Sequence, residues 1–371
     1  MKYTARIAIF SALTCIVAKA APFMAVGDNA ELFVTASANV QADDNIYLNP
    51  TNEKSDTIFS FTPGFDLVFG KGSATTGDVY YREEIRRYSS NTRQNTNLAN
   101  VGAQANYSNG VTKANLNASY AEVAQNDTGL NPTGDIVDRN LTNLSGKTEF
   151  GLTEKTSLSI GLNYDKTDYG PVSYVDSSAV SIPLDLYFQA SPKLDWSLGY
   201  SYRSTNLSGA ALDSNDNFLN IGARGEFSPK LTGQVRLGYT RRSFDVGPEQ
   251  NLFGANANLT YLYSEKTTYQ FNISNDFGSA STGASTKNFT IGLNATNRFS
   301  EQWYVNAGLS YQTINYGTRT DDYLQGLVGV SYVYNNVLNF SASYTYRNNS
   351  SALASAEFKN NVFSLGANVR Y

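Results

Sequence analysis

The sequence contains no histidine and a single cysteine, Cys15. Catalytic triads and dyads that use an imidazole base are therefore excluded, and so are zinc sites built from His and Cys ligands at regular spacings. One cysteine cannot form a disulfide within the chain, so its stability must come from other interactions. We therefore predict a protein that is not an enzyme and that holds no metal or cofactor.

The chain also lacks a strong positive net charge. The chain has 28 Lys and Arg residues against 32 Asp and Glu residues. Residues 1–20 hold three basic residues and no acid, so the rest of the chain carries 25 − 32 = −7. Nucleic-acid-binding proteins usually show a clear basic excess, and we expect no nucleic-acid partner.

Long hydrophobic runs are also missing after residue 20. A transmembrane helix needs about 20 predominantly apolar residues, and no later stretch provides them. A membrane protein with this sequence would have to be a β-barrel, which also satisfies every backbone hydrogen bond in lipid. Aromatic residues are abundant, with 26 Tyr and 20 Phe.

The N-terminus is typical of a secretory signal peptide. A short basic region precedes an apolar run over residues 7–18, and Ala18-Lys19-Ala20 has the small-x-small pattern of a cleavage site. We predict that residues 1–20 are removed and that residues 21–371 form the mature domain. The alternatives are a buried N-terminal helix, although little downstream is helical, and a lipoprotein box at Cys15, whose preceding residues match poorly.

Alternating apolar and polar residues, the period of a β-strand, recur through nearly all of the predicted mature domain. Eighteen such runs can be distinguished, an even number, as single-chain bacterial barrels usually have. The predicted strands are 30–42, 55–69, 78–89, 96–108, 111–124, 139–151, 156–168, 178–190, 194–206, 216–228, 231–244, 250–263, 266–278, 286–299, 303–316, 321–334, 337–348 and 359–371.

The connections alternate between short and long. Two- and three-residue turns such as Ser191-Pro192-Lys193 and Pro229-Lys230 consist of turn-forming residues. Longer polar segments lie between them, and only Gly70 to Gly77 breaks the order. The long segments are 43–54, 125–138, 169–177, 207–215, 279–285 and 349–358. Short turns at one rim and long loops at the other are typical of outer-membrane barrels.

The two faces of each run differ in polarity. In the run 194–206, Trp196, Leu198, Tyr200 and Tyr202 share one face, and the residues between them are small or polar. We predict an all-β fold, a transmembrane antiparallel up-and-down β-barrel of about 18 strands in the outer membrane, with a water-filled lumen. A soluble β-sandwich has the same period but would be unusually large with so many strands.

Many arginines fall on the face predicted to line the lumen. Fewer acids share it, among them Asp66, Glu84, Asp185, Glu226 and Asp276. The arginines either bind anionic solutes or pair with carboxylates and hold the barrel's shape. Tyr187, Tyr304 and Tyr323 also point inward, where they either stack on sugars or meet a loop folded into the lumen. The predicted lumen-lining arginines are Arg82, Arg86, Arg203, Arg224, Arg236, Arg242, Arg298, Arg347 and Arg370.

The strand 78–89 fits the pattern least well. Alternation places Glu83 and Arg87 on the lipid face, where an arginine at the bilayer midplane costs about 2–4 kcal/mol. A bulge, projection beyond the membrane or a different register would each remove the conflict.

Two acidic pairs lie next to predicted loops, in Asp43-Asp44-Asn45 and in Asp321-Asp322. Carboxylates at the membrane surface attract divalent cations near lipopolysaccharide. The alternative, which we favour, is that these groups are solvated loop carboxylates.

The chain ends in an alternating strand, 361–371, whose outer face carries apolar residues and a terminal aromatic. Pairing of this strand with the first one would close the barrel. The pattern matches the signal recognised by the barrel-assembly machinery, and the residues that form it are Phe363, Leu365, Val369 and Tyr371.

The segments Asp43 to Asn49 (D-D-N-I-Y-L-N) and Lys54 to Phe65 (K-S-D-T-I-F-S-F-T-P-G-F) resemble the opening of the β-barrel porin type 2 family. The resemblance continues through the repeated hairpins to the terminal V-R-Y. It implies an outer-membrane barrel associated with surface polysaccharide, serving as the last conduit for an exopolysaccharide, and it supplies no catalytic residues.

We therefore expect a conduit for exopolysaccharide export. The alternatives are a general diffusion porin and a non-conducting structural or surface-interaction barrel. The expected partners are outer-membrane lipid and lipopolysaccharide, the barrel-assembly machinery, and periplasmic components of polysaccharide export.

Overall fold

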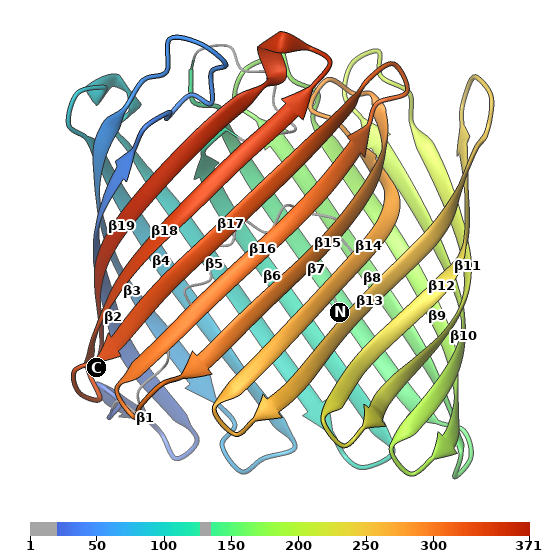
Figure 1. Cartoon of the computed structure of the whole chain (residues 1–371). Helices are drawn as coiled ribbons and strands as arrows, with labels where there is room; N and C mark the ends of the chain where they lie inside the picture. The colour runs from blue at the N-terminus through green and yellow to red at the C-terminus, as the bar shows by residue number, and fades with distance from the viewer. Residues whose placement is uncertain (1–20, 127–134) are drawn as a thin grey trace.

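The computed structural model describes residues 21–126 and 135–371, so the predicted signal peptide lies outside the described residues. Nineteen strands form one antiparallel sheet, and β2 to β19 close into a barrel of eighteen (Figure 1). Among the described residues, no helix is long and apolar enough to span a membrane. The predicted fold class is confirmed.

Every predicted strand is present, and each of its ends lies within three residues of the predicted one. The strands are β1 Met24–Val26, β2 Ala30–Asp43, β3 Asp56–Phe69, β4 Thr75–Tyr88, β5 Thr96–Ser108, β6 Thr112–Ala124, β7 Asp138–Gly151, β8 Thr156–Tyr169, β9 Ser177–Ser191, β10 Leu194–Leu207, β11 Ser214–Ser228, β12 Leu231–Phe244, β13 Gln250–Ser264, β14 Thr267–Ser279, β15 Ser285–Arg298, β16 Trp303–Asn315, β17 Thr320–Val333, β18 Leu338–Ser351 and β19 Phe358–Arg370. Two short 3₁₀ turns are η1 Thr92–Gln94 and η2 Ala354–Ala356.

The last strand closes the ring against the first long one. β19 pairs with β2 from Arg370, opposite Thr35, to Val362, opposite Asp43. The residue that follows extends the ladder, since the Tyr371 N–H donates to the Val34 carbonyl (2.9 Å) and the Val34 N–H donates to the Tyr371 carbonyl (2.7 Å). This pairing leaves no strand of the ring at a free edge of the sheet.

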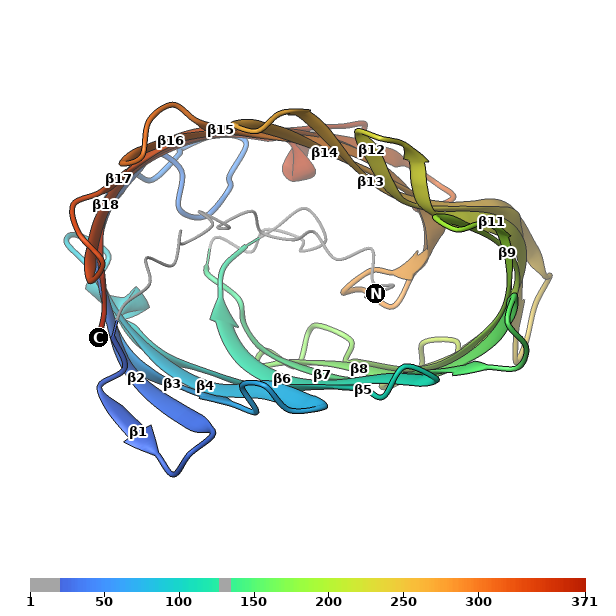
Figure 2. The same cartoon turned by 90° about the horizontal axis from the view of Figure 1, so that it is seen from below.

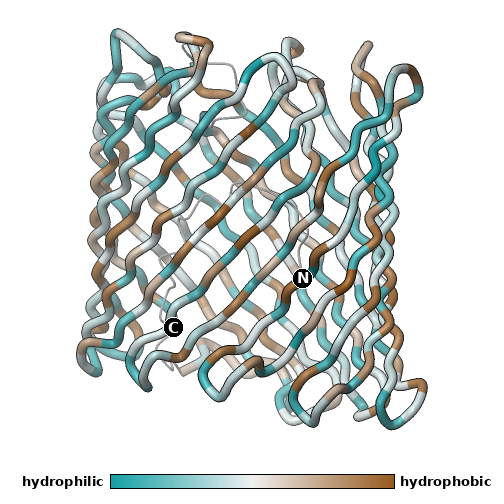
Figure 3. Tube along the Cα trace, turned by 45° about the vertical axis from the view of Figure 1, so that its right-hand side comes forward, coloured by the Kyte–Doolittle hydropathy of each residue, from teal (hydrophilic) through white to brown (hydrophobic). Residues whose placement is uncertain are grey.

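Hydrophobic and hydrophilic residues alternate along the strands (Figure 3), and they divide between an outer and an inner face as predicted. Trp196 and Leu198 are 56% and 55% exposed on the outer surface, whereas Ser197 between them is 8% exposed. Phe363, Leu365, Val369 and Tyr371 also lie exposed on the outside. An apolar outer surface of this kind is stable only against lipid.

The short connections lie at one end of the barrel, which we call the turn rim, and the longer ones lie at the other, the loop rim (Figure 1). The strand β1 was not predicted, because three residues carry too little periodicity. It pairs with the first residues of β2, and the resulting hairpin projects outside the ring at the turn rim (Figure 2). Phe23 beside it meets the ring of Tyr371 edge to face at 6.3 Å.

Several segments at the loop rim bend into the lumen. Figure 2 shows the β2–β3 connection, the adjoining ends of β6 and β7, and the β14–β15 connection inside the ring. In the first of these, Ile46, Tyr47 and Leu48 are at most 7% exposed. Leu48 packs on Tyr323 and Phe358 of the wall. The segment that resembles the porin family therefore narrows the mouth of the barrel.

The strand β4 contains no bulge. Its pairings with β3 and with β5 keep one register throughout, so Glu83 and Arg87 do lie on the outer face. The bulge proposed from the sequence is therefore wrong. The conflict is relieved differently: the Tyr81 hydroxyl donates to Glu83 (2.6 Å), and Arg87 lies one residue from the strand end and donates to the Thr96 carbonyl.

Deletion of Tyr371 tests the closing ladder. The deletion removes both hydrogen bonds to Val34, so we expect a several-fold smaller fraction of folded, membrane-inserted barrel. Electrophoretic mobility with and without heating measures that fraction, and export to the periplasm should be unchanged. Tyr371→Phe keeps the backbone and the ring and should behave as the wild type; loss of insertion in Tyr371→Phe as well would contradict this account.

Candidate functional site

The inner surface of the barrel is the candidate site. Of the nine arginines predicted to line it, eight form ion pairs with carboxylates. The ninth, Arg298, is exposed at the end of β15, beside the turn rim. The pairs are Arg82–Asp66, Arg86–Glu84, Arg203–Asp216, Arg203–Asp276, Arg224–Glu149, Arg224–Asp195, Arg236–Asp185, Arg242–Asp216, Arg347–Asp43 and Arg370–Asp66.

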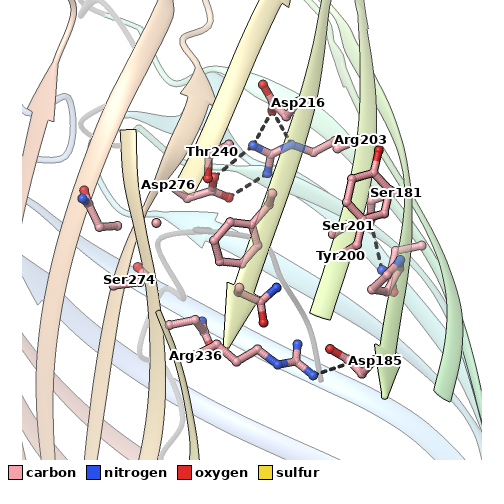
Figure 4. A pocket seen from close by; sticks show the side chains of 18 residues that line it. Ser181, Asp185, Tyr200, Ser201, Arg203, Asp216, Arg236, Thr240, Ser274 and Asp276 are labelled. Atoms are coloured by element: carbon pink, nitrogen blue, oxygen red, sulfur yellow. Dashed lines mark hydrogen bonds and ion pairs between the residues drawn. The ribbon is translucent and has the colours of Figure 1, made fainter. Parts of the chain in front are cut away.

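One cluster lies toward the loop rim on strands β10, β11, β12 and β14 (Figure 4). Asp216 accepts from Arg203 on one side (2.6 Å between Nη2 and Oδ2) and from Arg242 on the other (2.6 Å between Nε and Oδ1). Arg203 also donates to Asp276 at 2.7 Å. Arg242 is 1% exposed and lies over the ring of Phe277, with 4.6 Å between the guanidinium carbon and the ring centroid.

A second cluster lies nearer the turn rim. Arg224 donates two hydrogen bonds to Glu149 (2.6 and 2.7 Å) and stacks on Tyr187, with its guanidinium carbon 3.3 Å from the ring centroid. Arg236 donates to Asp185 (2.5 Å) and to the Tyr187 hydroxyl (3.0 Å). Charged groups that satisfy one another in this way offer little attraction to a passing ion.

Two glycines allow the pair Arg236–Asp185 to form across two intervening strands. Asp185 is on β9 and Arg236 is on β12. A Cβ at Gly199 would lie 2.6 Å from Asp185 Oδ1, and a Cβ at Gly222 would lie 3.0 Å from Arg236 Cγ. The hydrogen atoms at these positions leave the space that the two long side chains occupy.

A cavity of about 100 Å³ separates the two clusters (Figure 4). Its charged lining comes from Asp185 and Arg236 below and from Arg203, Asp216 and Asp276 above. Its neutral lining includes Asn163, Ser181, Ser201, Asn220, Thr240 and Ser274.

The strands β13 to β18 form a wall of a different kind. Between the rims, their inward positions carry amides, hydroxyls, glycines and one leucine, Leu327, and the charged inward side chains lie toward the strand ends: Asp276, Arg298, Asp321 and Arg347. The neutral wall, as we call it, consists of Asn256, Asn258, Asn272, Ser274, Thr290, Asn294, Asn306, Ser310, Gln325, Ser341 and Ser343.

The inward tyrosines have structural contacts. Tyr187 is 1% exposed inside its ion-pair cluster, and Tyr323 is 5% exposed, with its ring 6.2 Å from that of Phe358. Tyr323 therefore supports the segment that folds into the lumen, which is the second of the two roles predicted for it. Tyr304 is half-buried near the turn rim.

One carboxylate of each acidic pair is buried, so the interpretation as solvated groups was wrong for Asp43 and Asp321. Asp43 is 7% exposed and accepts from the Asn360 side-chain amide (2.6 Å) and from the Asn45 N–H (2.9 Å). Asp321 is fully buried and accepts from the Ser351 hydroxyl at 2.5 Å. These groups hold the inward segment and the loop rim in place. Among the described residues, no three potential metal ligands come together.

Sequence reasoning placed Asp66, Glu84, Asp185 and Asp276 on the lumen face, but it missed the partners Glu149, Asp195 and Asp216. Some were accessible, because Asp195 faces Arg224, and Asp216 faces both Arg203 and Arg242, on directly paired strands. The alternation of inward and outward residues along each strand, together with the register that a short hairpin turn sets, would have identified these pairs. Glu149 on β7 meets Arg224 on β11, which no local signal indicates.

Comparison with known proteins agrees with this architecture. Residues 196–371 match the model of a family described as "Putative beta-barrel porin 2". The resemblance to the β-barrel porins of type 2 is confirmed. The matched residues form the C-terminal half of this porin-like barrel. They do not include the opening segments, Asp43 to Asn49 and Lys54 to Phe65, that resemble the family. Residues 75–249 match a second family, "Surface lipoprotein assembly modifier", and neither family is described as an enzyme. No curated protein matches the chain.

Solved structures of the same fold are outer-membrane porins. OccAB2 of Acinetobacter baumannii has 11% sequence identity and a TM-score of 0.50, covering 93% of this chain and 98% of its own. OccK2 (OpdF) of Pseudomonas aeruginosa, solved in complex with glucuronate, has 10% identity and a TM-score of 0.50, covering 92% and 98%. Such low identities show the fold alone. The chain is thus a porin-like barrel of the outer membrane.

Replacing one partner of the buried pair tests the role of the arginines. Arg236→Met leaves Asp185 buried without its counter-charge, and we expect it to lower the free energy of unfolding by about 3–5 kcal/mol. Urea titration of the barrel in lipid vesicles, followed by tryptophan fluorescence, measures the change.

The double variant Arg236→Met with Asp185→Leu should recover most of the lost stability. The matched control is Arg241→Met, which breaks an exposed pair with Glu249 and should change stability by about 0–1 kcal/mol. Equal losses of unfolding free energy in the single and double variants would show that the unpaired charge of Asp185 is not what destabilises Arg236→Met.

Proposed function

We propose that the barrel is an outer-membrane conduit for a hydroxyl-rich polymer and that it serves exopolysaccharide export. The neutral wall carries this proposal. Its amides and hydroxyls exchange hydrogen bonds with sugar hydroxyls at little cost, and no fixed charge on that wall holds the chain back. The charges elsewhere in the lumen are largely neutralised in pairs.

The resemblance to the type 2 porins supports the same proposal, since it implies an association with surface polysaccharide. OccK2, a barrel of this fold, has been solved in complex with glucuronate, a sugar acid. General diffusion of small hydrophilic solutes is the second candidate, and the same neutral wall favours it. The partners we propose are lipopolysaccharide and outer-membrane lipid around the barrel, the assembly machinery, and periplasmic export components below it.

Secretion measurements separate export from general diffusion. Deletion of the gene should reduce secreted polysaccharide several-fold, and the wild-type gene should restore it. The variant Asn294→Trp with Ser343→Trp, which places two large rings on the neutral wall, should restore little. Leu309→Trp puts the same ring on the outer face of the same wall, where Leu309 is 55% exposed, and should restore secretion fully. Unchanged secretion after deletion would overturn the export proposal.

Planar-bilayer recording tests the lumen directly. We expect ohmic conductance with a reversal potential near zero in a salt gradient, because the lumen charges are paired. Thr290→Lys with Ser343→Lys adds unpaired positive charge to the neutral wall and should shift the reversal potential toward anion selectivity. Total absence of conductance in the wild type would favour a non-conducting barrel instead.

A further inference from the structure

The barrel wall is not paired along its whole height. Backbone pairing between β5 and β6 ends at Asn100, opposite Ala121. β5 goes on to pair with β4 as far as Thr96, and β6 goes on to pair with β7 as far as Ala124. The β5–β6 gap, residues 96–99 facing residues 122–124, therefore lies at the loop rim. It arises because the ends of β6 and β7 bend into the lumen (Figure 2).

Side chains close the gap in place of the backbone ladder. The Glu122 carboxylate accepts from the Ala99 N–H (2.9 Å) with one oxygen and from the Tyr120 hydroxyl (3.2 Å) with the other. Above the gap, the Asp135 carboxylate accepts from the Arg93 guanidinium (2.7 Å) and from the Gln94 amide (3.0 Å), which joins the two neighbouring loops. A carboxylate can exchange such partners for other donors without breaking the fold.

Glu122 borders both sides of the wall. On the inside it lines a lumen cavity of about 560 Å³ together with Arg82, Glu84 and Asn100. On the outside it meets Tyr120, which shares the lipid-side face of β6 with Leu116, 52% exposed.

The outer surface beside the gap is polar. The pairs Tyr81–Glu83 and Tyr120–Glu122 place hydroxyls and carboxylates where other strands carry apolar groups. Hydroxyl and carboxylate groups are suited to binding sugar hydroxyls, and tyrosine rings pack against the faces of sugars. Closer to the turn rim, Val101 and Leu116 form an apolar outer surface.

A comparable separation between β13 and β14 is held from inside by two arginine bonds, where the β5–β6 gap has one. Pairing there ends at Ala255, opposite Asn275, and the Asn275 amide donates to the Phe253 carbonyl (2.6 Å). The bent end of β14 is held from inside by Arg242, which donates to the Gly278 carbonyl (2.8 Å) and to the Ser285 hydroxyl (2.9 Å). At the β5–β6 gap, the corresponding internal bond comes from Arg86 to the Ala124 carbonyl (2.7 Å), and Glu122 bridges the strands.

We propose that the β5–β6 gap is a lateral gate between the lumen and the outer leaflet, with Glu122 as its closing group. The ligand class is a lipid with a saccharide headgroup, whose hydroxyls replace the Ala99 and Tyr120 contacts of Glu122 while its acyl chains stay on the apolar surface below. The gate is independent of the proposed export, since it provides a second path whether the lumen carries a polymer or small solutes.

A fluorophore at the gap tests the gate. In a Cys15→Ser background, Leu98→Cys is labelled with an environment-sensitive dye, and the barrel is reconstituted in phosphatidylcholine vesicles that contain spin-labelled lipid. Leu98 is 7% exposed and lies on the lumen side of the gap. We expect little quenching with Glu122 present and several-fold more in Glu122→Ala. Glu122→Gln, which keeps an acceptor for Ala99, should remain closed.

Two sites on β5 serve as matched controls. Gln104→Cys faces the lumen where β5 and β6 are paired and should not be quenched in either background; Ala103→Cys faces lipid and should be quenched in both. Heat-dependent electrophoretic mobility establishes that each variant is folded. A folded Glu122→Ala barrel without quenching at Leu98→Cys would overturn the gate.

Lipid composition tests the ligand class. With Glu122 present, adding lipopolysaccharide to the vesicles should raise quenching at Leu98→Cys, whereas adding more phosphatidylcholine should not. If Glu122→Ala opens the gap but lipopolysaccharide does not, the saccharide headgroup is the wrong ligand class. Val123→Cys, on the opposite edge of the gap, should report the same changes.

Discussion

Closure of the backbone ladder is the constraint on which the rest of the structure depends. In an apolar layer, each backbone N–H and C=O must find its partner within the protein, and the β19–β2 pairing removes the last open edge. Once the sheet is closed, the period of two along each strand divides the side chains between lipid and lumen. Trp196 and Ser197, adjacent in sequence, thereby meet opposite environments.

The shape of the closed sheet determines which charges meet. The ring is oval in cross-section, and β9 to β11 lie at one of its narrow ends (Figure 2). Tight curvature brings inward side chains of strands that are not neighbours into contact, as for Arg236 and Asp185 and for Arg224 and Glu149. Gly199 and Gly222 provide the space for the first of these pairs. The long side formed by β13 to β17 has no such crowding, and its inward residues are mostly neutral.

Polar side chains replace backbone pairing wherever the wall or a connection bends inward. Asp43 and Asn45 hold the β2–β3 segment against β19, and Asn45 is fully buried while it donates to the carbonyls of Asn49 and Lys359. Glu122 performs the same task at the β5–β6 gap. Such contacts satisfy backbone hydrogen-bonding groups that have no backbone partner on a neighbouring strand. The loop rim therefore has a defined shape, and a ligand can replace some of the bonds that maintain it.

The sequence by itself determined the eighteen long strands, their bounds, their two faces and the class of membrane they suit, because these follow from periods of two and from turn residues a few positions away. Pairs between neighbouring strands, such as Asp195 and Arg224, were also within its reach, since register follows from short turns. Only the tertiary structure decided that Asp43 and Asp321 are buried, that Glu83 faces outward without a bulge, and that Glu122 bridges a gap. Each of these depends on curvature or on hairpin bending, which arise from contacts between residues far apart in the chain and leave no local periodic signal.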